Sequence, residues 1–180
     1  MASKTLGTVA APWMQRIVQG ELSTSLWFNR ACYGPVQRFF ATVSWLGDGK
    51  LWYGLMALLP LVQGWDGAET SLRMIAAGVV GLLVYKLIKQ YTRRPRPCAA
   101  HPAIRAGTPP LDAYSLPSGH TLHAVSFTLI LVAAEPALAP LLVPLTLSIA
   151  ASRLVLGLHY PSDVLLGALI GAVLGLGFSA

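Results

Sequence analysis

Apolar segments separated by short breaks fill the chain beyond residue 50, and they constrain its fold more than any other feature. These segments cover residues 51–62, 71–91, 120–134, 138–158 and 164–178. A helix needs about 20 mainly apolar residues to cross a bilayer. The chain is 54% hydrophobic and only 11% charged, against roughly one quarter charged residues in soluble proteins. The sequence therefore predicts an all-α integral-membrane bundle of five or six transmembrane helices, in one domain that covers residues 1–180.

The first 50 residues have a different character and are expected to form an N-terminal interfacial region. Residues 22–45 mix apolar and aromatic side chains with arginines, which is typical of a helix lying in the membrane interface. Residues 1–19 lack the continuous apolar core of a signal peptide, so we expect a retained segment. Gly47-Asp48-Gly49 ends the region, and we expect a structural role for Asp48 in that turn.

Residues 92–117 form a loop that begins with a dense cluster of cations. The six prolines of this segment cannot continue a helix. The net charge of the chain is +6. Much of that surplus lies in Lys86, Lys89, Arg93, Arg94, Arg96 and Arg105. So compact a cluster favours a small anion or a lipid headgroup as partner over nucleic acid. We expect Arg93 and Arg94 to contact headgroups and to lie outside the site.

Three polar clusters stand at the ends of predicted membrane helices, where ionisable side chains are costly to place. They are Lys89 with Arg96-Pro97, then Pro117-Ser118-Gly119-His120, then Ser152-Arg153 with His159 and Asp163. The loop and two further crossings return the chain to the same face, so we expect the clusters to meet there. The catalytic core is accordingly expected within residues 71–179.

The first two clusters, together with Arg153, have the chemistry of a phosphate site. Ser118 stands where the N-cap of a helix is expected, so the amides of Gly119 and His120 can hold an anion. The fixed cations are Lys89, Arg96 and Arg153. Arginine binds phosphate oxygens in pairs, which favours a phosphate cradle.

Two histidines and one aspartate supply the groups that phosphoryl transfer needs. His159 and Asp163 are four residues apart, beside an expected helix start. Asp163 can accept a hydrogen bond from one imidazole nitrogen and leave the other nitrogen free to attack. His120, from a separate helix, can protonate the leaving oxygen. We expect His123, one turn later, to pack inside the bundle.

These residues resemble the motifs of the type 2 phosphatidic acid phosphatase family, whose site resembles that of the vanadium haloperoxidases. The matching pattern is Lys89, six residues, Arg96-Pro97; then Pro117-Ser118-Gly119-His120; then Ser152-Arg153, five residues, His159, three residues, Asp163. The resemblance covers residues 86–178. It implies His159 as nucleophile, Asp163 as its partner and His120 as general acid.

The same resemblance implies a set of phosphate ligands and a location. The implied ligands are Lys89, Arg96, Ser118, Gly119 and Arg153. It also implies catalysis without a metal ion or other cofactor, and an active site on the extracytoplasmic face, which we expect to be that of a bacterial inner membrane. The positive-inside rule would put the basic loop in the cytoplasm. Cations that catalysis requires are poor topological markers, so we follow the resemblance.

The expected function is hydrolysis of a lipid or isoprenoid phosphate or pyrophosphate through a phosphohistidine. Phosphatidic acid, phosphatidylglycerol phosphate, undecaprenyl pyrophosphate and a glycolipid phosphate are candidate substrates, which the motifs do not rank. Two alternatives stay open: a lipid-linked phosphotransferase, and a non-catalytic protein that binds or transports lipid phosphates. The bilayer is the other expected partner, and the sequence leaves the oligomeric state open.

Two further patterns concern helix packing and thiols. Gly167, Gly171 and Gly175 form a doubled small-xxx-small pattern, which favours close packing of helices in lipid. Cys32 and Cys98 are expected to be free thiols, with a bridge as the alternative in an oxidising compartment.

Overall fold

The computed structural model describes residues 12–179, with side chains from residue 20 onward, and this part of the chain is almost entirely helical. The expectation for residues 1–11 lies outside the described residues. The helices are α1 (Pro12–Asn29), α2 (Gly34–Gly47), α3 (Lys50–Gln63), α4 (Trp65–Thr92), α5 (Pro97–Ala100), α6 (Gly119–Ala134), the short 3-10 helix η1 (Pro136–Leu138), α7 (Ala139–Val155) and α8 (Pro161–Ser179).

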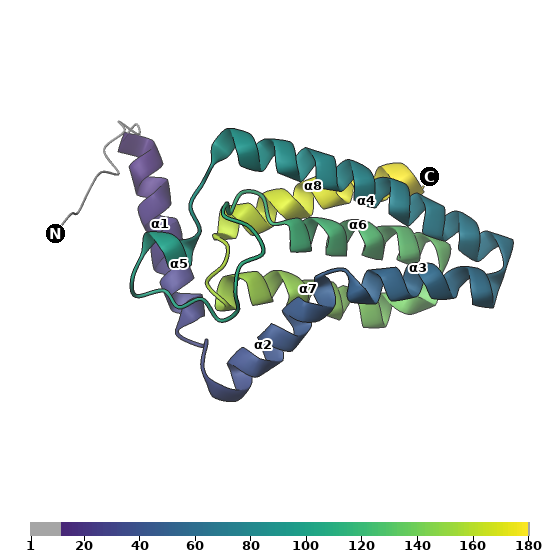
Figure 1. Ribbon diagram of the computed structural model, residues 1–180, viewed down its shortest axis with the longest axis horizontal. Helices are drawn as coiled ribbons and strands as arrows, with labels where there is room; N and C mark the ends of the chain where they lie inside the picture. The colour runs from purple at the N-terminus through teal and green to yellow at the C-terminus, as the bar shows by residue number, and fades with distance from the viewer. Residues whose placement is uncertain (1–11, 180) are drawn as a thin grey trace.

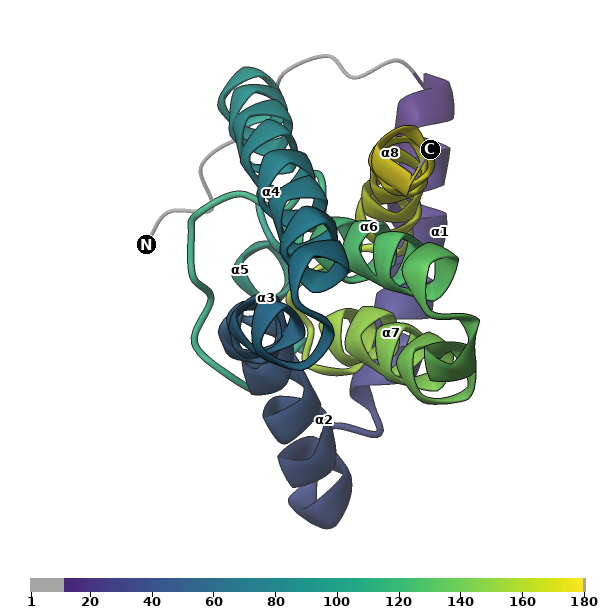
Figure 2. The same ribbon diagram turned by 90° about the vertical axis from the view of Figure 1, so that its right-hand side faces the viewer.

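Five of these helices run side by side as a bundle, namely α3, α4, α6, α7 and α8 (Figures 1 and 2). Helix α6 lies at the centre and packs against α4, α7 and α8. Its side chains Leu122, Phe127, Ile130 and Leu131 are buried there. This central helix carries the Ser118 to His120 motif at its first turn, so the motif is held at one end of the bundle.

The predicted close packing of the glycine-rich helix is confirmed, and its partner is α6. A Cβ atom on Gly167 would lie 2.5 Å from the carbonyl oxygen of Ser118, and one on Gly171 would lie 2.4 Å from that of Leu122. Real Cβ atoms do not approach backbone this closely, so only glycine allows the two helices to lie at this separation. The start of α8 is thereby brought against the start of α6.

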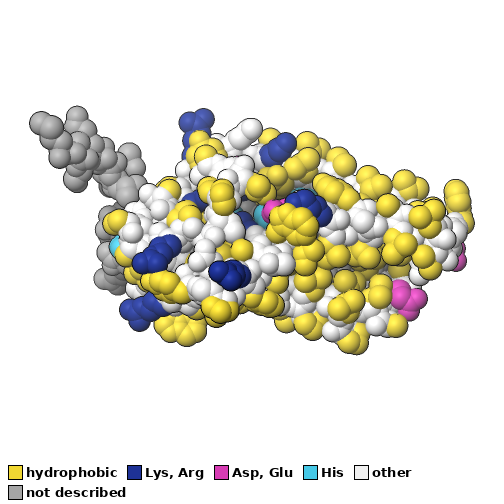
Figure 3. All heavy atoms as spheres, turned by 60° about the horizontal axis from the view of Figure 1, so that its bottom comes forward, with side chains coloured by type: hydrophobic (Ala, Val, Ile, Leu, Met, Phe, Trp, Pro, Cys, Tyr) yellow, Lys and Arg dark blue, Asp and Glu magenta, His cyan; other side chains and the backbone are white. Residues whose placement is uncertain are grey.

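The outer surface of the bundle is apolar, as expected for contact with lipid. Within residues 12–179, three helices are long and apolar enough to cross a membrane: Trp65–Thr92, Pro136–Val155 and Pro161–Ser179. Helix α6 is also apolar but has only 16 residues. Figure 3 shows hydrophobic side chains covering the bundle, while most Lys and Arg side chains on this face gather near the end that carries α1 and the loops. The prediction of five or six spans remains a prediction.

The single interfacial helix predicted over residues 22–45 is wrong, because the chain breaks there into α1 and α2. Both helices lie across one end of the bundle at steep angles to it (Figure 1). Asn29, at the end of α1, donates hydrogen bonds of 2.9 Å to the carbonyls of Arg105 and Val155 and accepts one from the Arg105 amide. Gly34 then adopts a positive φ of 50°. Long-range contacts of Asn29 therefore end the first helix.

The structure also moves two predicted boundaries and adds a short helix to the predicted loop. Helix α4 begins at Trp65 instead of residue 71, directly after a turn at Gly64 with φ 61°. Helix α7 ends at Val155 instead of residue 158, because Gly157 has φ 69° and the amides of Leu158 and His159 turn back to the Arg153 carbonyl. The proline-rich segment is a loop as predicted, except for α5, where proline at the first helical position is compatible with a helix.

Candidate active site

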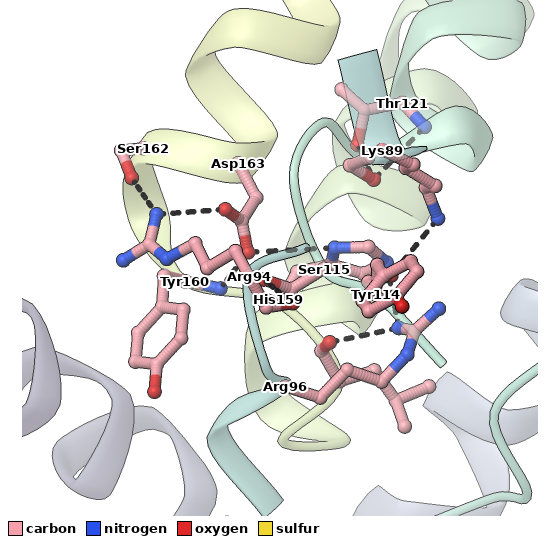
Figure 4. A network of polar contacts seen from close by, with 12 residues as sticks. Lys89, Arg94, Arg96, Tyr114, Ser115, Thr121, His159, Tyr160, Ser162 and Asp163 are labelled. Carbon is pink, nitrogen blue, oxygen red and sulfur yellow. Dashed lines mark hydrogen bonds and ion pairs between the residues drawn. The ribbon is translucent and has the colours of Figure 1, made fainter. Parts of the chain in front are cut away.

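The three sequence clusters meet at the end of the bundle that faces the loops. His159 lies between α7 and α8 and is only 1% exposed. Its Nε2 atom is 3.0 Å from Nη1 of Arg96, which also donates to the Leu158 carbonyl over 2.9 Å. Figure 4 shows His159 together with Lys89 of α4, Arg96 of the following loop and Asp163 at the start of α8. Arg96 therefore fixes the imidazole by holding both the ring and its neighbouring backbone.

Asp163, in the first turn of α8, approaches the other side of the His159 ring (Figure 4). Its Oδ2 atom lies 3.6 Å from Nδ1 of His159 and accepts a 2.8 Å hydrogen bond from the Tyr160 amide. The distance to Nδ1 exceeds that of a hydrogen bond, and within the described part of the chain Nδ1 has no other partner. A ring movement of a few tenths of an ångström would form the predicted His159–Asp163 hydrogen bond.

Arg94 is a residue that the sequence analysis placed outside the site and that the structure places in it. Its guanidinium lies 2.8 Å from Oδ1 of Asp163 and 2.7 Å from the Ser162 hydroxyl. It also forms an ion pair with Glu21 of α1, which accepts a hydrogen bond from the Ser162 amide. Arg93, by contrast, is exposed. Arg93 and Arg94 are adjacent, so sequence spacing does not show which of them binds Asp163. Only the fold identifies Arg94 as that residue.

The environment of His159 favours a neutral imidazole. Burial, together with the positive charges of Arg153 and Arg96, lowers the pKa of His159 well below its usual value. A neutral ring whose Nε2 faces cations can act as a nucleophile toward an anion bound by those same cations.

Two of the predicted phosphate ligands, Lys89 and Arg96, share one carboxylate partner, Asp112. The sequence did not predict a role for Asp112. Lys89 donates to both carboxylate oxygens, over 2.8 and 2.7 Å, and to the Tyr114 carbonyl over 3.0 Å. Arg96 donates to Oδ1 over 2.8 Å. Burial raises the pKa of Asp112, but hydrogen bonds and charges from Lys89 and Arg96 outweigh it and hold that pKa below its ordinary value. Asp112 is therefore ionised and lies where these two cations converge.

The remaining predicted ligands divide into two groups. Arg153 is 2% exposed, donates to the Ser44 hydroxyl over 2.5 Å and leaves its buried Nε without a partner among the described residues. Arg153 and Gly119 line the cavity described below. Ser118 is fully buried, caps α6 through the Thr121 amide and donates its own amide to the Asp163 carbonyl. The predicted N-cap is confirmed, and Ser118 lies behind the wall that Gly119 and His120 form.

His120 faces a second residue that the sequence analysis assigned only to a turn. Its Nε2 atom contacts Oδ1 of Asp48, which lies between α2 and α3. His123 instead points its two ring nitrogens at the Gly119 and Gly78 carbonyls and packs beside Phe127. His123 therefore packs inside the bundle as predicted, and it also lines the cavity described below.

One cavity of about 1060 Å³ joins these polar groups to an apolar groove. Its polar end is lined by Asp48, Lys89, Arg96, Asp112, His120, Arg153 and His159. Its apolar end runs between α3 and α4 and is lined by Met56, Met74, Ile75, Val79, Leu82 and Phe127. The cavity can therefore take a molecule with an anionic end and a hydrocarbon end.

A helical bundle with an apolar exterior and a pocket rich in cations at one end is typical of an integral membrane protein with a polar site at one end of the bundle. The family model described as the PAP2 superfamily matches residues 70–180, and the chain belongs to this superfamily. This match confirms the resemblance inferred from the three motifs.

Proteins named decaprenylphosphoryl-5-phosphoribose phosphatase are similar to the chain in sequence. The protein of Mycobacterium tuberculosis is 38% identical over 100 residues, which cover 56% of this chain and 54% of that protein. The protein of Mycolicibacterium smegmatis is 42% identical over 82 residues, or 45% of this chain and 43% of that protein. The match thus spans about half the length of these relatives.

Two solved structures share the fold. The crystal structure of Aquifex aeolicus LpxE has a TM-score of 0.78 and 26% identity, covering 87% of this chain and 93% of that one. A transmembrane PAP2-type phosphatidylglycerolphosphate phosphatase from Bacillus subtilis has a TM-score of 0.75 and 20% identity, covering 91% and 84%. These neighbours and the three apolar helices support an integral membrane protein.

Proposed function

We propose that this protein is an integral-membrane phosphatase that hydrolyses a lipid or isoprenoid phosphate through a covalent phosphohistidine on His159. The observation that carries the proposal is the position of His159 Nε2, 3.0 Å from Arg96 Nη1, on the wall of a cavity that also contains Lys89, Arg153 and His120. Phosphoryl transfer depends mainly on positioning and charge stabilisation. A neutral imidazole beside several fixed cations supports both.

In the first step of the proposed reaction, the Nε2 lone pair of His159 attacks phosphorus. An N–P bond forms, the bond from phosphorus to the leaving oxygen breaks, and His120 gives that oxygen a proton. In the second step, water gives a proton to His120 and attacks phosphorus, and the N–P bond breaks to release inorganic phosphate. Asp163 accepts a hydrogen bond from Nδ1 and stabilises the positive ring in the intermediate.

The phosphate ligands of the proposal are Lys89, Arg96, Gly119 and Arg153, with Ser118 as the cap that fixes the start of α6. The cations and the free amides at this helix start stabilise the charge that spreads over the phosphoryl oxygens. Asp112 gives up its two cations when the substrate phosphate binds, because both anions require the same donors.

The apolar end of the cavity supports a lipid as substrate. A hydrocarbon chain would lie along the groove between α3 and α4 while its phosphate reaches His159. The relatives and neighbours named above include phosphatases of a decaprenyl-linked phosphate and of phosphatidylglycerol phosphate. Lipid-linked phosphates are therefore the substrate class that we propose, with phosphatidic acid and undecaprenyl pyrophosphate as further candidates.

The experiment that tests the proposal is phosphate release by detergent-purified protein from a panel of these lipids, in the presence of a chelator. We expect release by the wild-type protein, loss of release in His159→Asn, and retention in His101→Asn, whose ring lies in the loop and binds the Ala103 amide. Inorganic phosphate as the only product that carries the transferred phosphoryl group favours hydrolysis over transfer to another lipid. Equal release by wild type and His159→Asn would overturn the phosphohistidine.

We further propose that the cavity faces the extracytoplasmic side of a bacterial inner membrane, as the family resemblance implies. Tyr91 is 92% exposed at the cavity end of α4, and Val62 is 71% exposed at the opposite end of the bundle. In a background without other cysteines, a membrane-impermeant maleimide should label Tyr91→Cys on intact cells and Val62→Cys only after permeabilisation. The reverse pattern would place the site in the cytoplasm.

A further inference from the structure

Asp48 and His120 form a contact between two segments that are 72 residues apart in the sequence. His120 is the second residue of α6, and Asp48 lies in the turn between α2 and α3. We propose that Asp48 is the positioning residue that orients His120 through Nε2 and favours its protonated form, from which the ring protonates the leaving oxygen. This inference rests on the proposed function, in which His120 is the general acid.

The turn that carries Asp48 is built for close approach to His120. A Cβ atom on Gly47 would lie 3.1 Å from Cγ2 of Ile149 and 3.4 Å from Cδ2 of His120, which is tighter than ordinary packing. Gly49 has φ 113°, a conformation that side chains disfavour. The two glycines therefore let the turn pack against α6 and α7 and aim the carboxylate between them at the imidazole.

The two ring nitrogens of His120 differ in their partners. Asp48 accepts a hydrogen bond from Nε2. Within the described part of the chain, Nδ1 makes no hydrogen bond, and His120 lines the cavity together with Lys89 and His159. Fixing Nε2 as a donor leaves Nδ1 as the nitrogen that can give a proton to the substrate and later take one from water, the same division of roles that a carboxylate imposes on a catalytic histidine elsewhere.

Asp48 supplies a charge that favours an imidazolium at this position. Among the described residues, the other groups that act electrostatically on His120 include Arg153 of α7, His123 of α6 and His159 of the α7–α8 loop, and these three are basic. Burial raises the pKa of Asp48, but the hydrogen bond and charge of His120, with the charges of Arg153 and Lys50, outweigh it and lower that pKa. Asp48 is therefore ionised, and it offsets part, though not all, of the unfavourable effect of burial and of Arg153 on a protonated ring.

The proton balance of the reaction shows which step depends on this pair. When the P–O bond breaks, its electrons stay on the leaving oxygen, and the proton on Nδ1 of His120 moves to that oxygen, leaving a neutral ring. An alkoxide needs this proton. A thiolate does not, since a thiol is a far stronger acid, with a pKa of about 8.5 in cysteine. The rate on a substrate whose bridging oxygen is replaced by sulfur therefore does not depend on proton donation by His120. That rate measures the remaining functions of the site, such as phosphate binding and attack by His159.

The test compares Asp48→Asn with wild-type protein on matched substrates, namely phosphatidic acid and its analogue with sulfur as the bridging atom. We expect kcat/KM for the oxygen ester to fall roughly 10- to 100-fold, which is part of the roughly 100- to 10,000-fold that general acid catalysis contributes, and kcat/KM for the sulfur ester to change by less than about 3-fold. As the pH is raised, activity on the oxygen ester should be lost at a lower pH in Asp48→Asn than in the wild-type protein. The reason is that the imidazolium no longer has a carboxylate to stabilise it. Asp48→Glu should recover part of the loss.

Two controls separate this inference from a structural effect. Asp66→Asn, in the first turn of α4 at the far end of the bundle, should leave both rates unchanged, and unfolding temperature should confirm that each variant is folded. Equal losses on both esters would mean that Asp48 only shapes the site, and the inference would be wrong. Unchanged rates in Asp48→Asn would overturn it while leaving the proposed phosphatase intact, whereas wild-type protein inactive on every lipid would overturn both.

Discussion

The guanidinium of Arg94 lies 2.8 Å from Oδ1 of Asp163 and joins the loop after α4 to the start of α8. The same guanidinium pairs with Glu21 of α1 and stacks over the Tyr160 ring at 4.1 Å. Asp163 is fully buried beside His159. Arg94 is thus the group that balances a buried carboxylate next to the proposed nucleophile, and it ties the N-terminal helix to the site.

Replacement of Arg94 by Gln should damage both stability and activity. Removing one partner of a buried ion pair leaves an uncompensated charge, which costs about 3–5 kcal/mol. Arg93→Gln is a matched control, because Arg93 is the exposed neighbour and surface changes usually stay within about 0.5 kcal/mol. Thermal unfolding in detergent and phosphate release measure the two effects. Equal behaviour of the two variants would contradict the role given to Arg94.

Replacement of Asp112 by Asn should increase the affinity for inorganic phosphate. Asp112 occupies Lys89 and Arg96, the cations that a phosphate would need, so the neutral amide removes a competing anion. We expect the inhibition constant of inorganic phosphate to fall by about 10-fold, equivalent to about 1.4 kcal/mol. Competitive inhibition assays on Asp112→Asn and on the distant Asp66→Asn check this. A weaker inhibition in Asp112→Asn would mean that the carboxylate assists anion binding.

Replacement of Gly171 by Ala should destabilise the bundle. The added Cβ atom would lie 2.4 Å from the Leu122 carbonyl oxygen, so α6 and α8 must separate, and overpacking of this kind costs about 1–3 kcal/mol. Gly177 lies on the same helix with nothing within 4 Å of the added atom, so Gly177→Ala should be neutral or slightly stabilising. The two unfolding temperatures, measured side by side, decide the matter.

Stability should fall as the solution becomes acidic, in part because of His159. The pKa of His159 is lowered in the folded protein by burial and by Arg153 and Arg96. Below the ordinary histidine pKa of about 6.5, the unfolded chain binds a proton that the folded protein does not, so stability drops by up to about 1.4 kcal/mol per pH unit. His159→Asn should show a smaller drop between pH 6.5 and 5. Parallel curves for the two proteins would contradict a lowered pKa.

The motifs allowed much of the fold and the candidate site to be predicted, because they depend on local chemistry. Ser118 caps α6, the prolines open the chain after α4, and the glycines on α8 allow close packing with another helix, all as their local patterns indicate. The residues that were missed act across long sequence separations. Asp48 meets His120 over 72 residues and Glu21 meets Arg94 over 73, and no periodicity within one segment carries that information.

The sequence alone determined the membrane class, the superfamily motifs and the residue types gathered at one end of the bundle, since apolar length and charge placement follow directly from the order of residues. Only the tertiary structure decided which of two adjacent arginines, Arg93 or Arg94, binds Asp163, and which acidic side chains reach the cavity. The physical reason is that ion pairs and hydrogen bonds act over about 3 Å. Such distances between remote segments are set by helix packing and turn geometry.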